Sequence, residues 1–206
     1  MAEAKTGSAG TDSAGSPAAP VRWRTLPALG LAALSGASLY VSFPPVDWWF
    51  LSYVALVPLL AAACTRRSWK GAALCGVVAG LVAYLPALAW LASVSVAGWI
   101  VLSGYVALYV VIASVLARAL RRGHPLLWPV LLAGAWVGLE FVRAKFATGF
   151  PWLLFGHTQY RSLGLLQSAA VTGVYGAGFL LVLVNAALAE VVLSARRHAA
   201  LARAGA

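Results

Sequence analysis

Charged residues are scarce in this sequence of 206 residues, and acidic residues are the scarcest. Asp, Glu, Lys and Arg make up 10% of the chain, whereas a soluble domain has about 25%. Apolar residues reach 62% instead. This balance excludes a soluble globular domain, a disordered chain and a coiled coil, and it indicates one domain whose solvent is mostly lipid.

Cysteine is nearly absent as well. Cys64 and Cys75 are the two cysteines, and two are too few for a disulfide framework. No Cys-x-x-Cys and no Cys/His cluster with the spacing of metal ligands occurs, so we expect neither a metal nor a cofactor. The net charge of +10 comes from short basic clusters between apolar runs. That arrangement predicts membrane topology and argues against a nucleic-acid partner.

Residues 1–24 contain small and polar residues with few charges, which predicts a disordered cytoplasmic tail. Arg22 and Arg24 then precede the apolar run Leu26–Ser42, as in a signal peptide. The run continues directly into Phe43-Pro44-Pro45 without a cleavage site. We therefore expect an uncleaved first span, followed by a transmembrane domain over residues 25–195 and a basic cytoplasmic tail over residues 196–206.

The fold expected for this chain is an all-α membrane protein, a six-span helical bundle. A span needs about 20 apolar residues, within a range of roughly 17–25. Five runs satisfy this directly: Leu26–Ser42, Trp48–Cys64, Gly71–Val94, Val96–Ala117 and Leu126–Val142. The run Leu163–Leu193 is too short for two spans and supplies the sixth. Its membrane core is expected at Val174–Leu193, with Leu163–Gly173 near an interface or against other helices.

The basic residues divide between the two sides of this bundle very unequally. Twelve lie in the N-terminal tail, after spans two and four, and after span six. Only Arg143, Lys145 and Arg161 fall on the other side. The positive-inside rule then predicts that both termini are cytoplasmic. Tryptophans near the expected span ends are typical of an aromatic belt at the membrane surface.

The connection between spans five and six, Arg143–Ser162, is the longest on the outer side and is rich in aromatics, Gly and Pro. Large apolar side chains this close together, Phe150 and Trp152 among them, have no reason to face water. We expect an interfacial or re-entrant external loop in which Gly149–Gln159 folds back onto the outer face of the bundle, with Phe150 and Trp152 in the membrane interface.

Two ionisable residues mark the start of this loop. Glu140 and Arg143 lie at i,i+3 helical spacing, so they are expected to pair. An ionisable residue within a span indicates a functional role, but simple neutralisation of Arg143 is the more usual explanation. His157 is interpreted as a hydrogen-bonded loop residue, because no Ser or Cys with a matching partner is near it. Lys145 and Arg161 either hold lipid phosphates or extend to the headgroups.

Several motifs, in one order along the chain, carry a resemblance to a known family. They are Phe43-Pro44-Pro45, Ala55-Leu56-Val57-Pro58-Leu59, Trp136-xxx-Glu140-xx-Arg143, Gly149-Phe150-Pro151-Trp152, Phe155-Gly156-His157-Thr158-Gln159, and Gly173-Val174-Tyr175-Gly176 followed by Phe179 and Asn185. Together they resemble the N-terminal membrane domain of apolipoprotein N-acyltransferases, over about residues 26–195. A tyrosine is common in that family where this sequence has His157, which argues against a catalytic role for this histidine.

The resemblance implies a bacterial inner-membrane protein of lipoprotein maturation, in which an acyl chain moves from a phospholipid to the α-amine of a lipoprotein cysteine. In that family a nitrilase-like domain with a Glu, Lys and Cys triad carries the chemistry, through an acyl thioester. No counterpart of that triad occurs in this sequence, so we expect no catalytic residue and no activity from this chain alone. Cys64 and Cys75 are interpreted as packing residues.

Three functional hypotheses follow. In the first, the chain is the membrane half of an N-acyltransferase, with phospholipid, a separately encoded nitrilase-like chain and a lipoprotein substrate as partners. Its candidate lipid-binding residues are Glu140, Arg143, Phe150, Trp152, His157 and Gln159. In the second, it is a non-catalytic membrane anchor or partner of a polyprenol-phosphate mannosyltransferase-like enzyme. The third, a small transporter, is disfavoured because the spans hold few polar groups and no inverted repeat.

Overall fold

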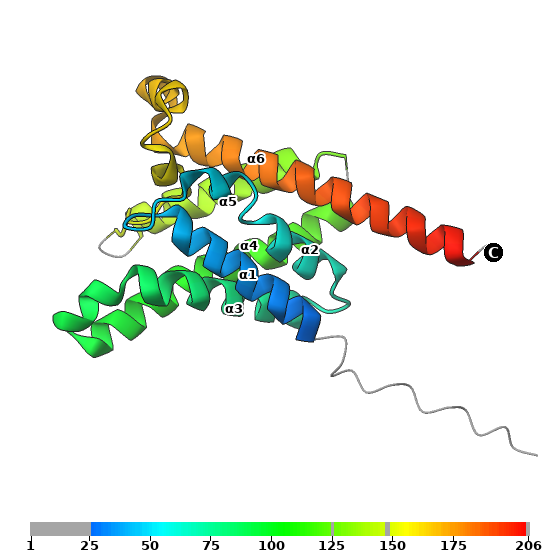
Figure 1. Cartoon of the computed structure of the whole chain (residues 1–206), viewed down its shortest axis with the longest axis horizontal. Coiled ribbons are helices and arrows are strands. Elements are labelled where there is room, and N and C mark those ends of the chain that lie inside the picture. The colour runs from blue at the N-terminus through cyan, green and yellow to red at the C-terminus, as the bar shows by residue number, and fades with distance from the viewer. Residues whose placement is uncertain (1–25, 125, 147–148, 205–206) are drawn as a thin grey trace, which may run out of the picture.

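The computed structural model describes residues 26–124, 126–146 and 149–204, and these ranges form helices and connecting turns without a strand. The described residues form six α-helices, and Figure 1 shows them gathered in one body. Their bounds are α1 Leu26–Ser42, α2 Val57–Thr65, α3 Trp69–Ala87, α4 Val96–Gly123, α5 Trp128–Lys145 and α6 Leu163–Ala204. Three 3₁₀ helices, η2 Trp49–Tyr53, η3 Ala89–Ser93 and η4 Phe155–Gln159, lie in the connections. The all-α class is therefore confirmed, whereas the tail expected over residues 1–24 falls outside the described residues.

Three of these helices are long and apolar enough to cross a membrane: α3, α4 and the part of α6 between Leu163 and Ala199. Two further apolar helical segments, Leu26–Ser42 and Trp49–Thr65, are shorter. These lengths and the composition indicate a membrane protein. Many large apolar side chains are exposed on the surface of the body, as expected where lipid replaces water.

The layer of α1, α3 and α4 packs through small residues. A Cβ atom at Gly36 of α1 would overlap the carbonyl oxygen of Ala79 in α3. At Gly80 of α3 it would lie 2.8 Å from the Cβ of Ala107 in α4. Helix backbones approach this closely only where a side chain is missing, which is the usual way that helices associate in lipid.

The second expected span is not one continuous helix. The backbone leaves helical geometry between η2 and α2, and Pro58 occupies the first turn of α2, where its missing N–H costs nothing. Side chains replace the lost helical hydrogen bonds. Asn185 of α6 accepts from the N–H of Leu56 and donates to the carbonyl of Ser52, both at 2.8 Å, and Ser35 donates to the carbonyl of Ala55 at 2.5 Å. An irregular backbone at membrane depth is tolerated when protein groups satisfy it in this way.

Helix α6 is interrupted at Gly173, whose φ of 63° and ψ of −168° are not helical. Figure 1 shows the segment before this residue turning sharply away from the long remainder of α6. The break falls at the residue that separates the two expected parts, Leu163–Gly173 and Val174–Leu193, and glycine is the residue that adopts such a φ without strain. The helix continues without a break through Arg196 and Arg197 to Ala204, beyond the expected domain boundary at residue 195.

Candidate functional site

The loop that joins α5 to α6 carries the candidate site, and η4 is its central element. Phe155, Thr158 and Gln159 of η4 are buried. Gly156 rests directly on α6, because a Cβ atom there would overlap the carbonyl oxygen of Val174 and lie 3.0 Å from the N–H nitrogen of Gly178. The backbone of the loop therefore packs directly against the backbone of α6. This close contact is possible because Gly156 has no side chain.

Gln159 ties η4 to η2. Its Nε2 atom donates to the hydroxyl of Ser52 at 2.7 Å and to the carbonyl of Trp49 at 3.2 Å. Its Oε1 atom accepts from the hydroxyl of Tyr53 at 3.1 Å. Every polar atom of this amide is thus used inside the protein. Gln159, a candidate lipid ligand, thus joins η2 to η4, and it also lines the cavity described below.

Glu140 and Arg143 hold the loop by its backbone. Glu140 Oε1 accepts from the N–H of Phe155 at 2.7 Å. Arg143 Nη2 donates to the carbonyls of Trp152 and Leu153, at 3.1 and 3.2 Å. The two residues are only 5% and 2% exposed.

The expected ion pair between these two residues is wrong. In the described part of the chain, ion pairs join Arg121 to Glu190 and Arg161 to Asp47. The i,i+3 spacing does place Glu140 and Arg143 on one face of α5, but that face is covered by loop backbone that needs hydrogen-bond partners. Each of the two side chains therefore bonds to the backbone of the loop instead of pairing with the other side chain.

The remaining loop residues lie at the outer surface. The rings of Phe150 and Trp152 stack with centroids 6.1 Å apart; Phe150 is half-buried and Trp152 is 57% exposed. Arg161 and the hydroxyl of Tyr160 both bind Asp47 Oδ2 at 2.7 Å. This cluster connects the loop to the turn after α1. Lys145 ends α5 in an exposed position.

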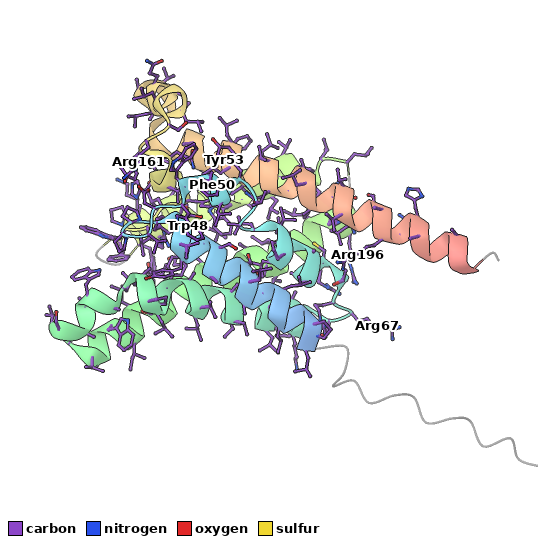
Figure 2. The ribbon with its side chains drawn as sticks, in the orientation of Figure 1. Trp48, Phe50, Tyr53, Arg67, Arg161 and Arg196 are labelled. Carbon is purple, nitrogen blue, oxygen red and sulfur yellow. The ribbon has the colours of Figure 1, made fainter. Side chains whose placement is uncertain are left out.

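The two ends of the body differ in their side chains. Figure 2 shows Trp48, Phe50, Tyr53 and Arg161 gathered near the loop, with Arg67 and Arg196 at the far side. The ion pair of Arg121 with Glu190, at 2.6 Å, joins α4 to α6 and is supported by Ser194. Both cysteines are unpaired; Cys75 is buried and Cys64 half-buried, in keeping with packing roles.

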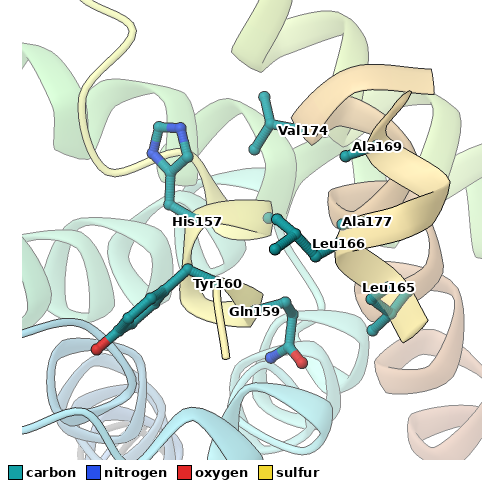
Figure 3. A pocket seen from close by; sticks show the side chains of 9 residues that line it. His157, Gln159, Tyr160, Leu165, Leu166, Ala169, Val174 and Ala177 are labelled. Carbon is teal, nitrogen blue, oxygen red and sulfur yellow. The ribbon is translucent and has the colours of Figure 1, made fainter. Parts of the chain in front are cut away.

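An apolar cavity of about 360 Å³ lies between η4 and the kinked start of α6. Pockets for small molecules occupy about 300–1,000 Å³. The helical wall consists of Leu165, Leu166, Ala169, Val174 and Ala177, and η4 supplies the opposite wall. In Figure 3, the side chain of Leu166 lies between the ribbon of α6 and η4, whereas the side chains of His157 and Tyr160 point away from Leu165 and Leu166. The lining of the cavity is thus mostly hydrocarbon and carries no charged group.

His157, another candidate, therefore lies at the rim. Partial burial of the imidazole, followed by the positive charge of Arg143, lowers the pKa of His157 below its ordinary value. A neutral imidazole at the rim can donate one hydrogen bond from one ring nitrogen and accept one at the other. Among the described residues, no group of three or more His, Cys, Asp or Glu side chains could hold a metal ion.

Sequence reasoning missed the cavity and the role of Asn185. The cavity depends on the angle at which α6 turns at Gly173, which a linear pattern does not encode. Asn185 carried a usable signal, because an amide within a long apolar run needs internal partners. Its partners, Ser52 and Leu56, lie more than 120 residues away along the chain.

Comparison with known proteins gives one consistent result. The family model described as apolipoprotein N-acyltransferase N-terminal domain matches residues 35–187. The chain is 42% identical over 176 residues to an apolipoprotein N-acyltransferase of Geobacter metallireducens, covering 79% of this chain and 33% of that protein. For the proteins with the same description in Rhodopirellula baltica and Chromobacterium violaceum, identity is 33% and 34%, over 82% and 93% of this chain and 31% and 39% of theirs. The chain thus spans about a third of the length of these relatives.

Proposed function

The chain belongs to the apolipoprotein N-acyltransferase family, and from that premise we propose that it is the phospholipid-binding membrane part of an N-acyl-transfer system in lipoprotein maturation. The observation that carries this proposal is the apolar cavity between η4 and α6. Its walls are aliphatic and it opens beside an aromatic-rich loop, a combination suited to one acyl chain of a phospholipid.

The proposed arrangement places six spans in the bacterial inner membrane, with both termini cytoplasmic and η4 on the outer side. Basic residues at one end and aromatic residues at the other support this orientation. Trp152 and Phe150 then lie at the outer interface, and the loop is interfacial. Arg161, although paired with Asp47, remains largely exposed and near enough to the surface to meet a lipid phosphate.

Orientation is tested by cysteine accessibility in a background without Cys64 and Cys75. An impermeant thiol reagent applied to intact cells should label Arg161→Cys at the loop. It should label Arg122→Cys, at the end of α4, only after the membrane is permeabilised. Labelling of Arg122→Cys in intact cells would reverse the topology.

Acyl-chain binding is tested with a phospholipid that carries a photoreactive group on its acyl chain. We expect crosslinks in peptides from η4 and the first part of α6. Leu166→Trp should fill the cavity and reduce the crosslinking yield several-fold. Leu163→Trp is the matched control, because Leu163 lies on the same segment but is 72% exposed and does not line the cavity. Equal yields in both variants would refute the cavity as the acyl site.

In this proposal the acyl chain passes to a nitrilase-like catalytic unit on the outer side, and a lipoprotein is the final acceptor. A chimera tests the assignment: the matched third of the Geobacter metallireducens relative is replaced by this chain, and lipoprotein N-acylation is measured in cells depleted of their own enzyme. Activity of the chimera, lost with Leu166→Trp and kept with Leu163→Trp, is the expected result. An inserted but inactive chimera would contradict the proposal.

A further inference from the structure

Arg161, Tyr160 and Asp47 form a polar cluster beside the apolar cavity. The Nε atom of Arg161 lies 2.7 Å from Asp47 Oδ2 and donates to the hydroxyl of Tyr160 at 3.0 Å. The same hydroxyl donates to Asp47 Oδ2 at 2.7 Å. Each of the three side chains therefore contacts the other two, and together these contacts orient the guanidinium.

Asp47 is the fixed member of this cluster. Its side chain is only 9% exposed, whereas that of Arg161 is 61% exposed. The backbone of Asp47 has a φ of 62°, a conformation that aspartate adopts more readily than most residues. Its N–H donates to the carbonyl of Phe43 at 3.0 Å. The carboxylate thus comes from a defined turn after α1, and it holds an exposed guanidinium by one side.

The other side of the guanidinium is open. The contacts with Asp47 and Tyr160 are both made by Nε. Among the described residues, none accepts a hydrogen bond from the two Nη groups. Paired N–H donors of an arginine match two oxygens of a phosphate group, which is why arginine is used for bidentate phosphate binding. Arg161 is therefore positioned through Nε and free to bind a ligand through Nη.

Tyr160 connects this guanidinium to the cavity. It is one of the residues that line the cavity, and the guanidinium carbon of Arg161 lies 5.5 Å from the centre of its ring. Figure 3 shows the hydroxyl of Tyr160 directed away from Leu165 and Leu166. Polar donors and an aliphatic cavity thus adjoin the same tyrosine. A phospholipid has the same order of groups, because glycerol joins its phosphate to its acyl chains.

We propose that Arg161 binds the phosphate of the phospholipid whose acyl chain occupies the cavity, and that Asp47 and the hydroxyl of Tyr160 position the guanidinium. This inference rests on the function proposed above and adds the residues that bind the headgroup. Because Asp47 balances the charge of Arg161, recognition depends on the hydrogen bonds of the two Nη groups and not on net charge.

The first experiment compares two lipids that differ only in the phosphate. A phospholipid and a diacylglycerol with the same photoreactive acyl chain are crosslinked to the full chain in maltoside micelles. Arg161→Gln should lower the yield of the phospholipid at the cavity several-fold and leave that of the diacylglycerol unchanged. Arg161→Lys keeps the charge without the paired donors and should lose nearly as much. Lys145→Gln, which removes an exposed basic side chain at the end of α5, should change neither yield.

The diacylglycerol also controls for a structural effect, because Arg161 joins the loop to the turn after α1. An equal fall in both yields would show that Arg161 only supports the loop, and the proposal would be rejected. It would be rejected as well if Arg161→Gln changed neither yield.

The positioning role of the hydroxyl is tested with Tyr160→Phe. This variant keeps the ring that lines the cavity and removes the group that bonds to Arg161 and Asp47. We expect a smaller fall than in Arg161→Gln, again for the phospholipid alone. A phospholipid yield equal to that of the unmodified chain would exclude this role.

The second experiment separates failure of this inference from failure of the proposed function. A phospholipid that carries its photoreactive group on the headgroup should label the peptide that contains Arg161, and inorganic phosphate in the buffer should not compete. Competition would indicate a site for free phosphate and overturn the proposal. Acyl labelling of the cavity without headgroup labelling at Arg161 would overturn it too, and leave the proposed function intact. Headgroup labelling that Arg161→Gln removes, without acyl labelling of the cavity, would instead retain the phosphate contact and refute the acyl site.

Discussion

Two regions of the molecule pack in opposite ways. One is the layer of α1, α3 and α4, and the other is the outer assembly of η2, η4 and α5. In the layer, glycines at positions 36 and 80 let regular helices touch, and helical hydrogen bonds satisfy the backbone. In the outer assembly the backbone is irregular, and side-chain amides, a carboxylate and a guanidinium satisfy it. A helix pair needs only space, whereas an irregular segment in lipid needs a polar partner for each exposed backbone group.

Breaking the layer should have the largest effect. Gly36→Val places a side chain against the backbone carbonyl of Ala79, which cannot rotate away. We expect a loss of about 3 kcal/mol in the free energy of unfolding, at the upper end of the usual cost of overpacking. The measurement is the folded fraction in mixed micelles as SDS is titrated in.

Gly30→Val is the matched control for that variant. Gly30 lies on the same helix, and nothing lies within 4 Å of the place where its Cβ would be. The same intrinsic helix penalty therefore applies without the collision. Equal destabilisation by the two variants would show that close packing at Gly36 is not what holds α1 to α3.

The break between η2 and α2 should be the next most sensitive point. Asn185→Leu removes the partners of Ser52 and Leu56 and leaves a buried carbonyl and a buried N–H unsatisfied. The expected cost is about 2 kcal/mol by the same SDS titration. Gln167→Leu, an exposed amide on the same helix, should change the midpoint little. If the two variants behave alike, the amide of Asn185 does not support the break.

These two regions also show what the sequence could predict. Apolar runs describe the regular helices, so α1, α4 and α5 were predictable from local pattern. The break near Val54 was not, because the run is apolar throughout and its stabilising amide comes from α6. The pairing of Glu140 with Arg143 failed for the same reason: helical spacing gives the face on which a residue lies, and the loop that covers this face decides its partners.

The attachment of the loop to α5 should depend on whether the side chain at position 140 has a hydrogen-bond acceptor, and not on the size of that side chain. Glu140→Leu leaves the N–H of Phe155 buried without an acceptor, at a cost of about 1 kcal/mol. Glu140→Gln keeps an oxygen in the same place and should restore most of this loss. Limited proteolysis checks the location: cleavage between Gly149 and Phe155 should rise in Glu140→Leu only. Similar cleavage in both variants would mean that charge, not the acceptor, holds the loop.

The smallest expected effect concerns the rim of the cavity, where η4 meets solvent. Because the pKa of His157 is lowered in the folded protein, the unfolded chain takes up the proton first as the pH falls. The contribution of neutral His157 is therefore complete above the ordinary histidine pKa of about 6.5, and it is lost as the pH falls through the lower folded pKa. Thermal unfolding of the detergent-solubilised protein between pH 5 and pH 8, values chosen to bracket that transition, should show a shallow decrease in Tm toward low pH that His157→Gln flattens. The decrease should be small because the side chain is exposed to solvent. A profile unchanged by His157→Gln would mean that the imidazole is solvated like that of an unfolded chain and that folding does not lower the pKa of His157.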